Sequence, residues 1–103
     1  MAKDKIEKVK LPVYISSAKQ YAQGETFSIA NYLDAKGIIF QCRRYSYVSS
    51  KFVSMELITN DAANNVIFPD SSGSGRNTTL QIQPTVTVSS TADNVAIDML
   101  IIY

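Results

Sequence analysis

The sequence predicts an all-β protein, an antiparallel β-sandwich of jelly-roll-like type with about seven or eight short strands. Apolar and polar residues alternate almost without a break from Thr78 to Tyr103, and this period of two is typical of strands with one buried face. Strand-like segments recur along the rest of the chain at intervals of about 8 to 12 residues, with turn-forming residues between them. No helical pattern alternates with these strands, so a βαβ fold is not expected.

The first ten residues are basic and weakly patterned. We expect residues 1–10 to form an N-terminal arm, followed by a single β-sandwich domain over residues 11–103. The arm either orders on a neighbouring subunit or an acidic surface, or is a solvated terminus without a role. Its candidate assembly residues are Lys3, Lys5, Lys8 and Lys10.

Two short strands and one helical turn are expected before the middle of the chain. Val9–Ile15 predicts the first strand, and Pro12, which has no backbone N–H, indicates that this strand lies at a sheet edge or a bulge. Glu25–Ile29 predicts the second strand, because its apolar residues lie two positions apart. Residues 31–37 predict a single helical turn that ends at Gly37.

The segment Ile38–Val48 predicts the central strand. Because residues two apart share a face of a strand, Arg43, Tyr45 and Tyr47 are expected to project together. Guanidinium and aromatic groups on one face stack on bases, sugars or another protein, so these three residues are a candidate partner surface. The alternative is that half-exposed tyrosines pack against arginine stems and only cover the sheet.

Arg44 lies on the predicted core face of the same strand, where a charged group needs a partner. We expect it either to reach the rim of the sheet or to pair with a carboxylate such as Glu56 or Asp98. If it does neither, the predicted register of this strand is wrong.

A hairpin is expected next, with Phe52–Thr59 and Asn65–Phe68 as its two strands. Residues 60–64 between them combine small residues with turn formers that tolerate left-handed backbone geometry. Pro69–Asn77 then predicts a flexible loop rich in Ser and Gly. The candidate mobile residues of this loop are Ser74, Gly75 and Arg76.

The C-terminal part of the chain predicts three strands, over Thr78–Gln83, Thr85–Ser89 and Val95–Tyr103. Pro84 separates the first two. The last strand is apolar on both faces near its end, which indicates a central strand or one that another subunit covers. One face of this last strand carries Val95, Ile97, Met99, Ile101 and Tyr103.

The composition argues against the familiar catalytic sites. The chain has no histidine, which excludes a Ser-His-Asp arrangement and a mixed His/Cys zinc site. Its nine acidic residues are scattered singly, no phosphate-binding Gly-rich motif occurs, and no spacing matches a calcium loop. Cys42, the one cysteine, is expected to be a small buried residue and not a nucleophile. We therefore predict a protein that is not an enzyme and has no catalytic, cofactor-binding or metal site.

Charge and hydropathy limit the partners. The formal net charge of +1 supplies little attraction for nucleic acid. No apolar run approaches the roughly 18 to 20 residues that a membrane-spanning helix needs. The start of the chain is charged and has no apolar segment behind it, so we expect synthesis in the cytoplasm without a signal peptide.

In overall character the chain resembles small virus and phage capsid-associated β-sandwich proteins, such as penton, decoration and spike-base proteins. The resemblance rests on the missing signal sequence, on turns rich in Ser, Thr and Asn, on an extendable arm and on a strand at the C-terminus. It implies a non-enzymatic structural subunit that is incorporated into a virion, forms a homo-oligomer and contacts other structural subunits.

Two other functions stay open. A ligand-binding β-module for carbohydrate or cell-surface recognition would use loops and exposed tyrosines, although the chain lacks tryptophan, the favoured platform for sugars. A single-stranded nucleic-acid binder of the OB type would use the strand that carries Arg43 and Tyr45, and the near-neutral charge argues against it.

Overall fold

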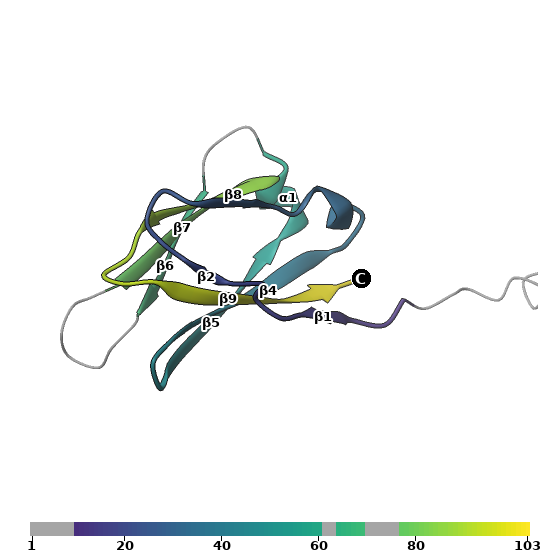
Figure 1. The fold of residues 1–103 in the computed structure, drawn as a ribbon. Coiled ribbons are helices and arrows are strands. Elements are labelled where there is room, and N and C mark those ends of the chain that lie inside the picture. The colour runs from purple at the N-terminus through teal and green to yellow at the C-terminus, as the bar shows by residue number, and fades with distance from the viewer. Residues whose placement is uncertain (1–9, 61–63, 70–76) are drawn as a thin grey trace, which may run out of the picture.

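The structure is a computed structural model and describes residues 10–60, 64–69 and 77–103. Two antiparallel sheets face each other and enclose one core (Figure 1), so the predicted all-β sandwich is confirmed. Some of the predicted arm and loop residues lie outside the described residues. These are Lys3, Lys5, Lys8, Ser74, Gly75 and Arg76.

The described residues form nine strands and two short helical segments. The strands are β1 (Val13–Ile15), β2 (Gln20–Tyr21), β3 (Thr26–Ser28), β4 (Gly37–Arg44), β5 (Tyr47–Ser54), β6 (Asn64–Pro69), β7 (Asn77–Ile82), β8 (Thr85–Ser90) and β9 (Val95–Ile102). The helical segments are η2 (Ala30–Tyr32) and α1 (Met55–Ile58). Sheet A has the order β1-β9-β4-β5, with β2 also paired to β9, and sheet B has the order β3-β8-β7-β6.

The strand pairing combines long-range and local partners. β1 and β2 pair with β9, and β3 pairs with β8. N-terminal strands therefore lie antiparallel to C-terminal strands in both sheets. β4–β5, β6–β7 and β7–β8 pair instead as neighbours in sequence. Pairs between distant segments and three local hairpins therefore make up the two sheets.

β9 is a central strand of sheet A, as its apolar pattern predicts. It lies between β1 and β4, with Ile101 opposite both Val13 and Ile38. Ile101 is fully buried, and burying an aliphatic side chain of this size stabilises a fold by about 1.5 to 3 kcal/mol. The other β9 members of the core are Val95, Ile97 and Met99, which meet Leu80, Ile82, Val86 and Val88 of sheet B in one cluster.

The predicted strand over Ile38–Val48 is wrong beyond Arg44. The chain reverses at Tyr45 and Ser46, and β5 returns along β4 with Tyr47 opposite Arg44. Tyr45 has a φ of 56°, the left-handed geometry found in two-residue hairpin turns. Such turns usually place Gly or Asn at this position, so the tyrosine gives no sign of the reversal in the sequence.

The predicted hairpin of Phe52–Thr59 with Asn65–Phe68 is also wrong. β5 belongs to sheet A and β6 to sheet B, so the chain crosses between the sheets here. After β5 the chain forms the short helix α1, because the Ser54 side chain accepts a hydrogen bond from the Leu57 N–H and caps its first turn.

The helical turn predicted over residues 31–37 lies slightly earlier, at η2. Gly37 does not end it but begins β4, opposite Ser54 of β5. A Cβ atom at Gly37 would overlap the ring of Phe52, so glycine is needed here for close packing and not for a positive φ. Pro12 directly precedes β1, which lies at an edge of sheet A, in agreement with its predicted position.

Candidate functional site

The predicted partner surface is divided by the turn at Tyr45. Arg43 faces outward from sheet A, opposite Val48 of β5, whereas Tyr47 pairs with Arg44 on the other face of the sheet. Tyr45 lies in the turn itself and is 86% exposed. The three side chains that a continuous strand would have aligned therefore point in different directions.

Arg43 covers a buried carboxylate on the outer face of sheet A. Its Nε and Nη2 atoms lie 2.5 and 3.2 Å from the two carboxylate oxygens of Asp98, whose side chain is only 1% exposed. The Ser17 N–H donates a further hydrogen bond of 2.8 Å to the same group. Burial by itself raises the pKa of Asp98, but the bonds from Arg43 and Ser17 outweigh it and hold that pKa below its ordinary value.

Arg44 pairs with a carboxylate at the rim of the sheet, as the sequence predicts, but the partner is Asp93 and not Glu56 or Asp98. Its side chain is 6% exposed, and its Nη2 atom lies 2.7 Å from a carboxylate oxygen of Asp93 in the turn before β9. The Tyr45 hydroxyl donates to the same oxygen over 3.3 Å. The Arg44 guanidinium lies 5.2 Å from the centre of the Tyr45 ring, a cation–π distance.

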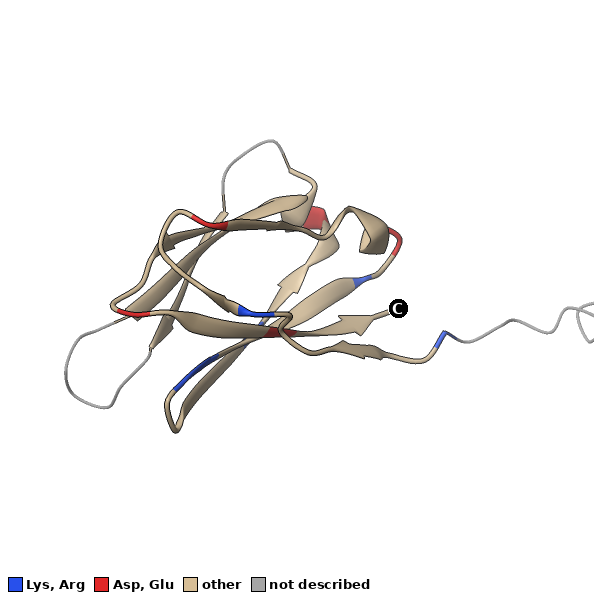
Figure 2. Ribbon diagram, viewed as in Figure 1, with Lys and Arg blue, Asp and Glu red and all other residues tan. Residues whose placement is uncertain are grey.

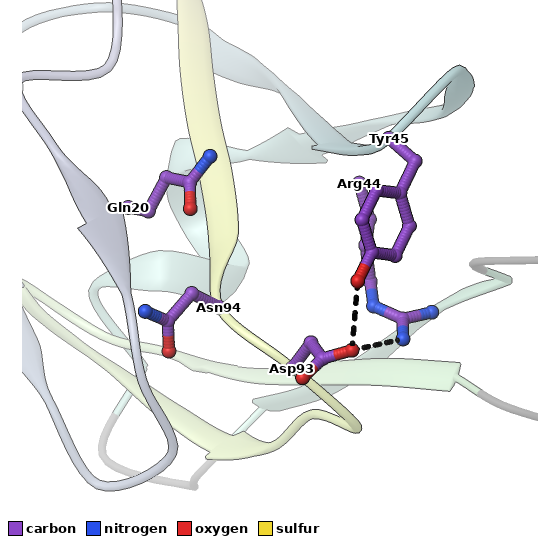
Figure 3. A pocket seen from close by; sticks show the side chains of 5 residues that line it. All are labelled: Gln20, Arg44, Tyr45, Asp93 and Asn94. Atoms are coloured by element: carbon purple, nitrogen blue, oxygen red, sulfur yellow. Dashed lines mark hydrogen bonds and ion pairs between the residues drawn. The ribbon is translucent and has the colours of Figure 1, made fainter.

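The side chains of Arg44, Tyr45 and Asp93 line one wall of a polar pocket of about 280 Å³ (Figure 3). The other lining residues are Gln20 of β2 and Asn94, which directly precedes β9. Figure 3 shows the Gln20 carboxamide directed into the space that faces Tyr45. We call this the rim pocket, lined by Gln20, Arg44, Tyr45, Asp93 and Asn94.

Of the five rim-pocket residues, the sequence pattern singles out Tyr45 and Arg44 but gives no sign of the other three. These are Asp93 and Asn94 in the turn before β9 and Gln20 in a two-residue strand, which only the folded sandwich brings together. A left-handed φ at a tyrosine costs about 1 to 2 kcal/mol relative to an ordinary backbone conformation. The rim pocket is therefore built partly on a strained residue, which is common at functional sites.

A second feature of the outer face of sheet A is apolar. Tyr14, Leu100, Ile39 and Phe52 are neighbours in the register of β1, β9, β4 and β5, so they form one row across the sheet. Tyr14 is 61% and Phe52 54% exposed, and the row borders a depression of about 150 Å³ above Asp98. We call Tyr14, Leu100, Ile39 and Phe52 the outer row.

Of the four candidate lysines of the arm, the structure describes Lys10. Its side chain contacts residues of the β-sandwich domain of the same chain. Its Nζ lies 2.7 Å from an oxygen of Asp34 and 4.5 Å from the centre of the Tyr103 ring. Lys10, the last residue of the predicted arm, therefore lies beside Tyr103 at the C-terminus.

The described lysines and arginines all lie on or beside strands of sheet A (Figure 2), where Lys10, Arg43 and Arg44 are paired with carboxylates. Within the part of the chain that the structure describes there is no group of three or more His, Cys, Asp or Glu side chains arranged for a metal ion, and no helix has the length and apolarity needed to cross a membrane. Cys42 is buried, and burial together with the nearby Asp98 raises the pKa of its thiol to about 12. A thiol with so high a pKa is a poor nucleophile near neutral pH.

Comparison of the chain with protein-family models, with curated proteins and with solved structures found no match.

Proposed function

We propose that this protein is a non-enzymatic structural subunit that assembles with copies of itself through the outer face of sheet A. The observation that carries the proposal is the outer row. The setting we propose for this assembly, from the character of the sequence, is a virion.

The outer row is apolar where a sheet that faces only water is usually polar. Tyr14 and Phe52, at its two ends, keep more than half of their surface exposed. Large exposed side chains in one continuous patch are typical of protein–protein contact sites, whereas single exposed apolar residues are ordinary. The row crosses all of β1, β9, β4 and β5, so a partner would pack against rigid strands and not against loops.

The charges on this face favour a second copy as the partner. The charged side chains that the strand register places there, Arg43 and Asp98, are bonded to each other. Two copies of this face can therefore meet around a twofold axis without repulsion between like charges. A strongly basic or acidic partner would gain little from a face whose charges are already paired.

Size-exclusion chromatography with light scattering, over a range of protein concentrations, tests the proposal. We expect a discrete oligomer that Ile39→Thr or Phe52→Thr dissociates, because each substitution removes apolar area from the outer row. The control is Ile67→Thr, since Ile67 is 49% exposed but lies on β6 of sheet B. Threonine has the β-branched shape that strands favour, and circular dichroism checks that each variant retains the fold.

A monomer at every concentration would contradict the proposal. Equal dissociation by Ile67→Thr and by Ile39→Thr would also contradict it, because the contact would then not lie on the outer row.

A further inference from the structure

We propose that the rim pocket binds one neutral sugar residue. This site is separate from the outer row and does not depend on the proposed assembly. It lies where β4 turns into β5, opposite the turn before β9 (Figure 3).

The charge of the rim pocket favours a neutral ligand. Among the described residues that line the pocket, Arg44 is the one cation and Asp93 the one anion, and their side chains are 2.7 Å apart. A phosphate or carboxylate ligand would have to compete with Asp93 for the guanidinium, and a cationic ligand would have to compete with Arg44 for the carboxylate. The pairing of Arg44 with Asp93 therefore disfavours both anionic and cationic ligands.

The polar groups of the lining match neighbouring hydroxyls. The carboxamides of Gln20 and Asn94 each offer a donor and an acceptor, and the Asp93 carboxylate offers acceptors only. A sugar hydroxyl both donates and accepts, so adjacent hydroxyls can bond to an amide N–H and to an amide or carboxylate oxygen at once. Figure 3 draws no hydrogen bond from Gln20 or Asn94 to the other lining residues, so within this set both amides are available to a ligand.

Tyr45 supplies the apolar surface that the C–H face of a sugar ring requires. The side chain is 86% exposed, yet its hydroxyl is bonded to Asp93 and its ring lies over the Arg44 guanidinium. The ring is therefore fixed in place while one side stays accessible. An aromatic ring with an apolar body and a polar tip suits a ligand that is itself amphipathic.

The size of the rim pocket limits the ligand to one residue. Its volume of about 280 Å³ is near the lower end of the range for small-molecule sites, roughly 300 to 1,000 Å³. A longer glycan would bind with one residue in the pocket and the remainder outside.

Saturation-transfer NMR with a panel of monosaccharides tests the inference. The panel contains glucose, galactose, mannose, fucose and N-acetylglucosamine as neutral probes, and sialic acid and inorganic phosphate as charged ones. We expect transfer to at least one neutral sugar at millimolar concentration. Asn94→Ala and Gln20→Ala should each weaken binding at least several-fold, whereas Asn65→Ala and Gln23→Ala, which remove exposed amides elsewhere, should not.

Tyr45→Gly separates a binding role from a structural one. Glycine adopts a positive φ without strain, so this variant should stay folded. We expect it to lose sugar binding while its thermal transition is retained. Binding that survives both Tyr45→Gly and Asn94→Ala would overturn the assignment to the rim pocket. Binding of sialic acid or phosphate alone, or of none of the probes, would overturn the neutral-sugar assignment.

Discussion

Arg44 and Asp93 form an ion pair between unequal partners: the Arg44 side chain is 6% exposed and that of Asp93 is 54% exposed. The pair joins the last residue of β4 to the turn before β9. It therefore brings a guanidinium that lies on the core side of sheet A to the rim of the sandwich, where water reaches its partner. This arrangement explains how a chain of modest size accommodates a buried arginine.

The unequal burial predicts unequal effects of substitution. Asp93→Ala should lower the free energy of unfolding by about 1 to 3 kcal/mol, because it leaves a buried guanidinium with one partner fewer. Arg44→Met should cost less, since it keeps most of the apolar stem and leaves a carboxylate that water already solvates. Urea unfolding of both variants and of the double variant measures the difference. A larger loss in Arg44→Met than in Asp93→Ala would contradict this explanation.

The positive φ of Tyr45 predicts an order among substitutions at this position. Tyr45→Gly and Tyr45→Ala both remove the ring and its bond to Asp93, so the difference between them reports only on the backbone. We expect the glycine variant to be more stable than the alanine variant by about 1 kcal/mol, because alanine retains the steric cost of the left-handed conformation. Thermal or urea unfolding of the two variants checks the order. Equal stability would mean that the turn relaxes once the ring is gone.

How far the sequence predicts this fold depends on how the chain marks its turns. The C-terminal strands were predicted to within a residue or two, because Pro84 and the residues around Asp93 separate clear period-two segments. The reversal at Tyr45 was missed because a tyrosine occupies the left-handed position. The sequence also does not predict the crossing of the chain from sheet A to sheet B after Ser54. The strand-like alternation of β5 continues into the helix α1, so the hydropathy pattern does not mark where the strand ends.

The candidate sites were less predictable than the fold, because both depend on pairing between distant segments. Arg44 and Asp93 are 49 positions apart in sequence. Ile39 and Leu100 each look like ordinary strand residues. Only the register of β4 against β9 places them side by side in the outer row, and no local pattern encodes that register.

The buried carboxylate of Asp98 predicts a dependence of stability on pH. Its pKa is lower in the folded protein than the value of about 3.9 expected in the unfolded chain. The unfolded state therefore takes up its proton first as the pH falls, and the stabilisation present above about pH 4 is lost as the pH drops toward the folded pKa. Asp98→Asn should be less stable than the natural protein at pH 7, and this difference should narrow toward pH 3.

Urea unfolding between pH 3 and 7 measures this effect. Asp34→Asn is the matched control, because Asp34 is also paired with a basic side chain, that of Lys10, but both side chains of this pair are more than half exposed. Exposed pairs contribute little, so the control should show a much smaller dependence. If Asp98→Asn and the natural protein lose stability in parallel as the pH falls, Asp98 does not contribute to the acid sensitivity.

The last strand predicts that the C-terminal residues are required for folding. Ile101 is fully buried and lies between Val13 and Ile38, and the Lys36 N–H donates a 2.7 Å hydrogen bond to the carbonyl of Ile102. Deletion of residues 101–103 should therefore abolish the cooperative thermal transition. Ile101→Ala alone should cost about 2 to 5 kcal/mol by opening a cavity in the core, whereas Ile102→Ala, at a half-buried position on the outer face, should cost less. A truncated protein with an unchanged transition would contradict this prediction, because it would mean that the fold is stable without the buried side chain of Ile101.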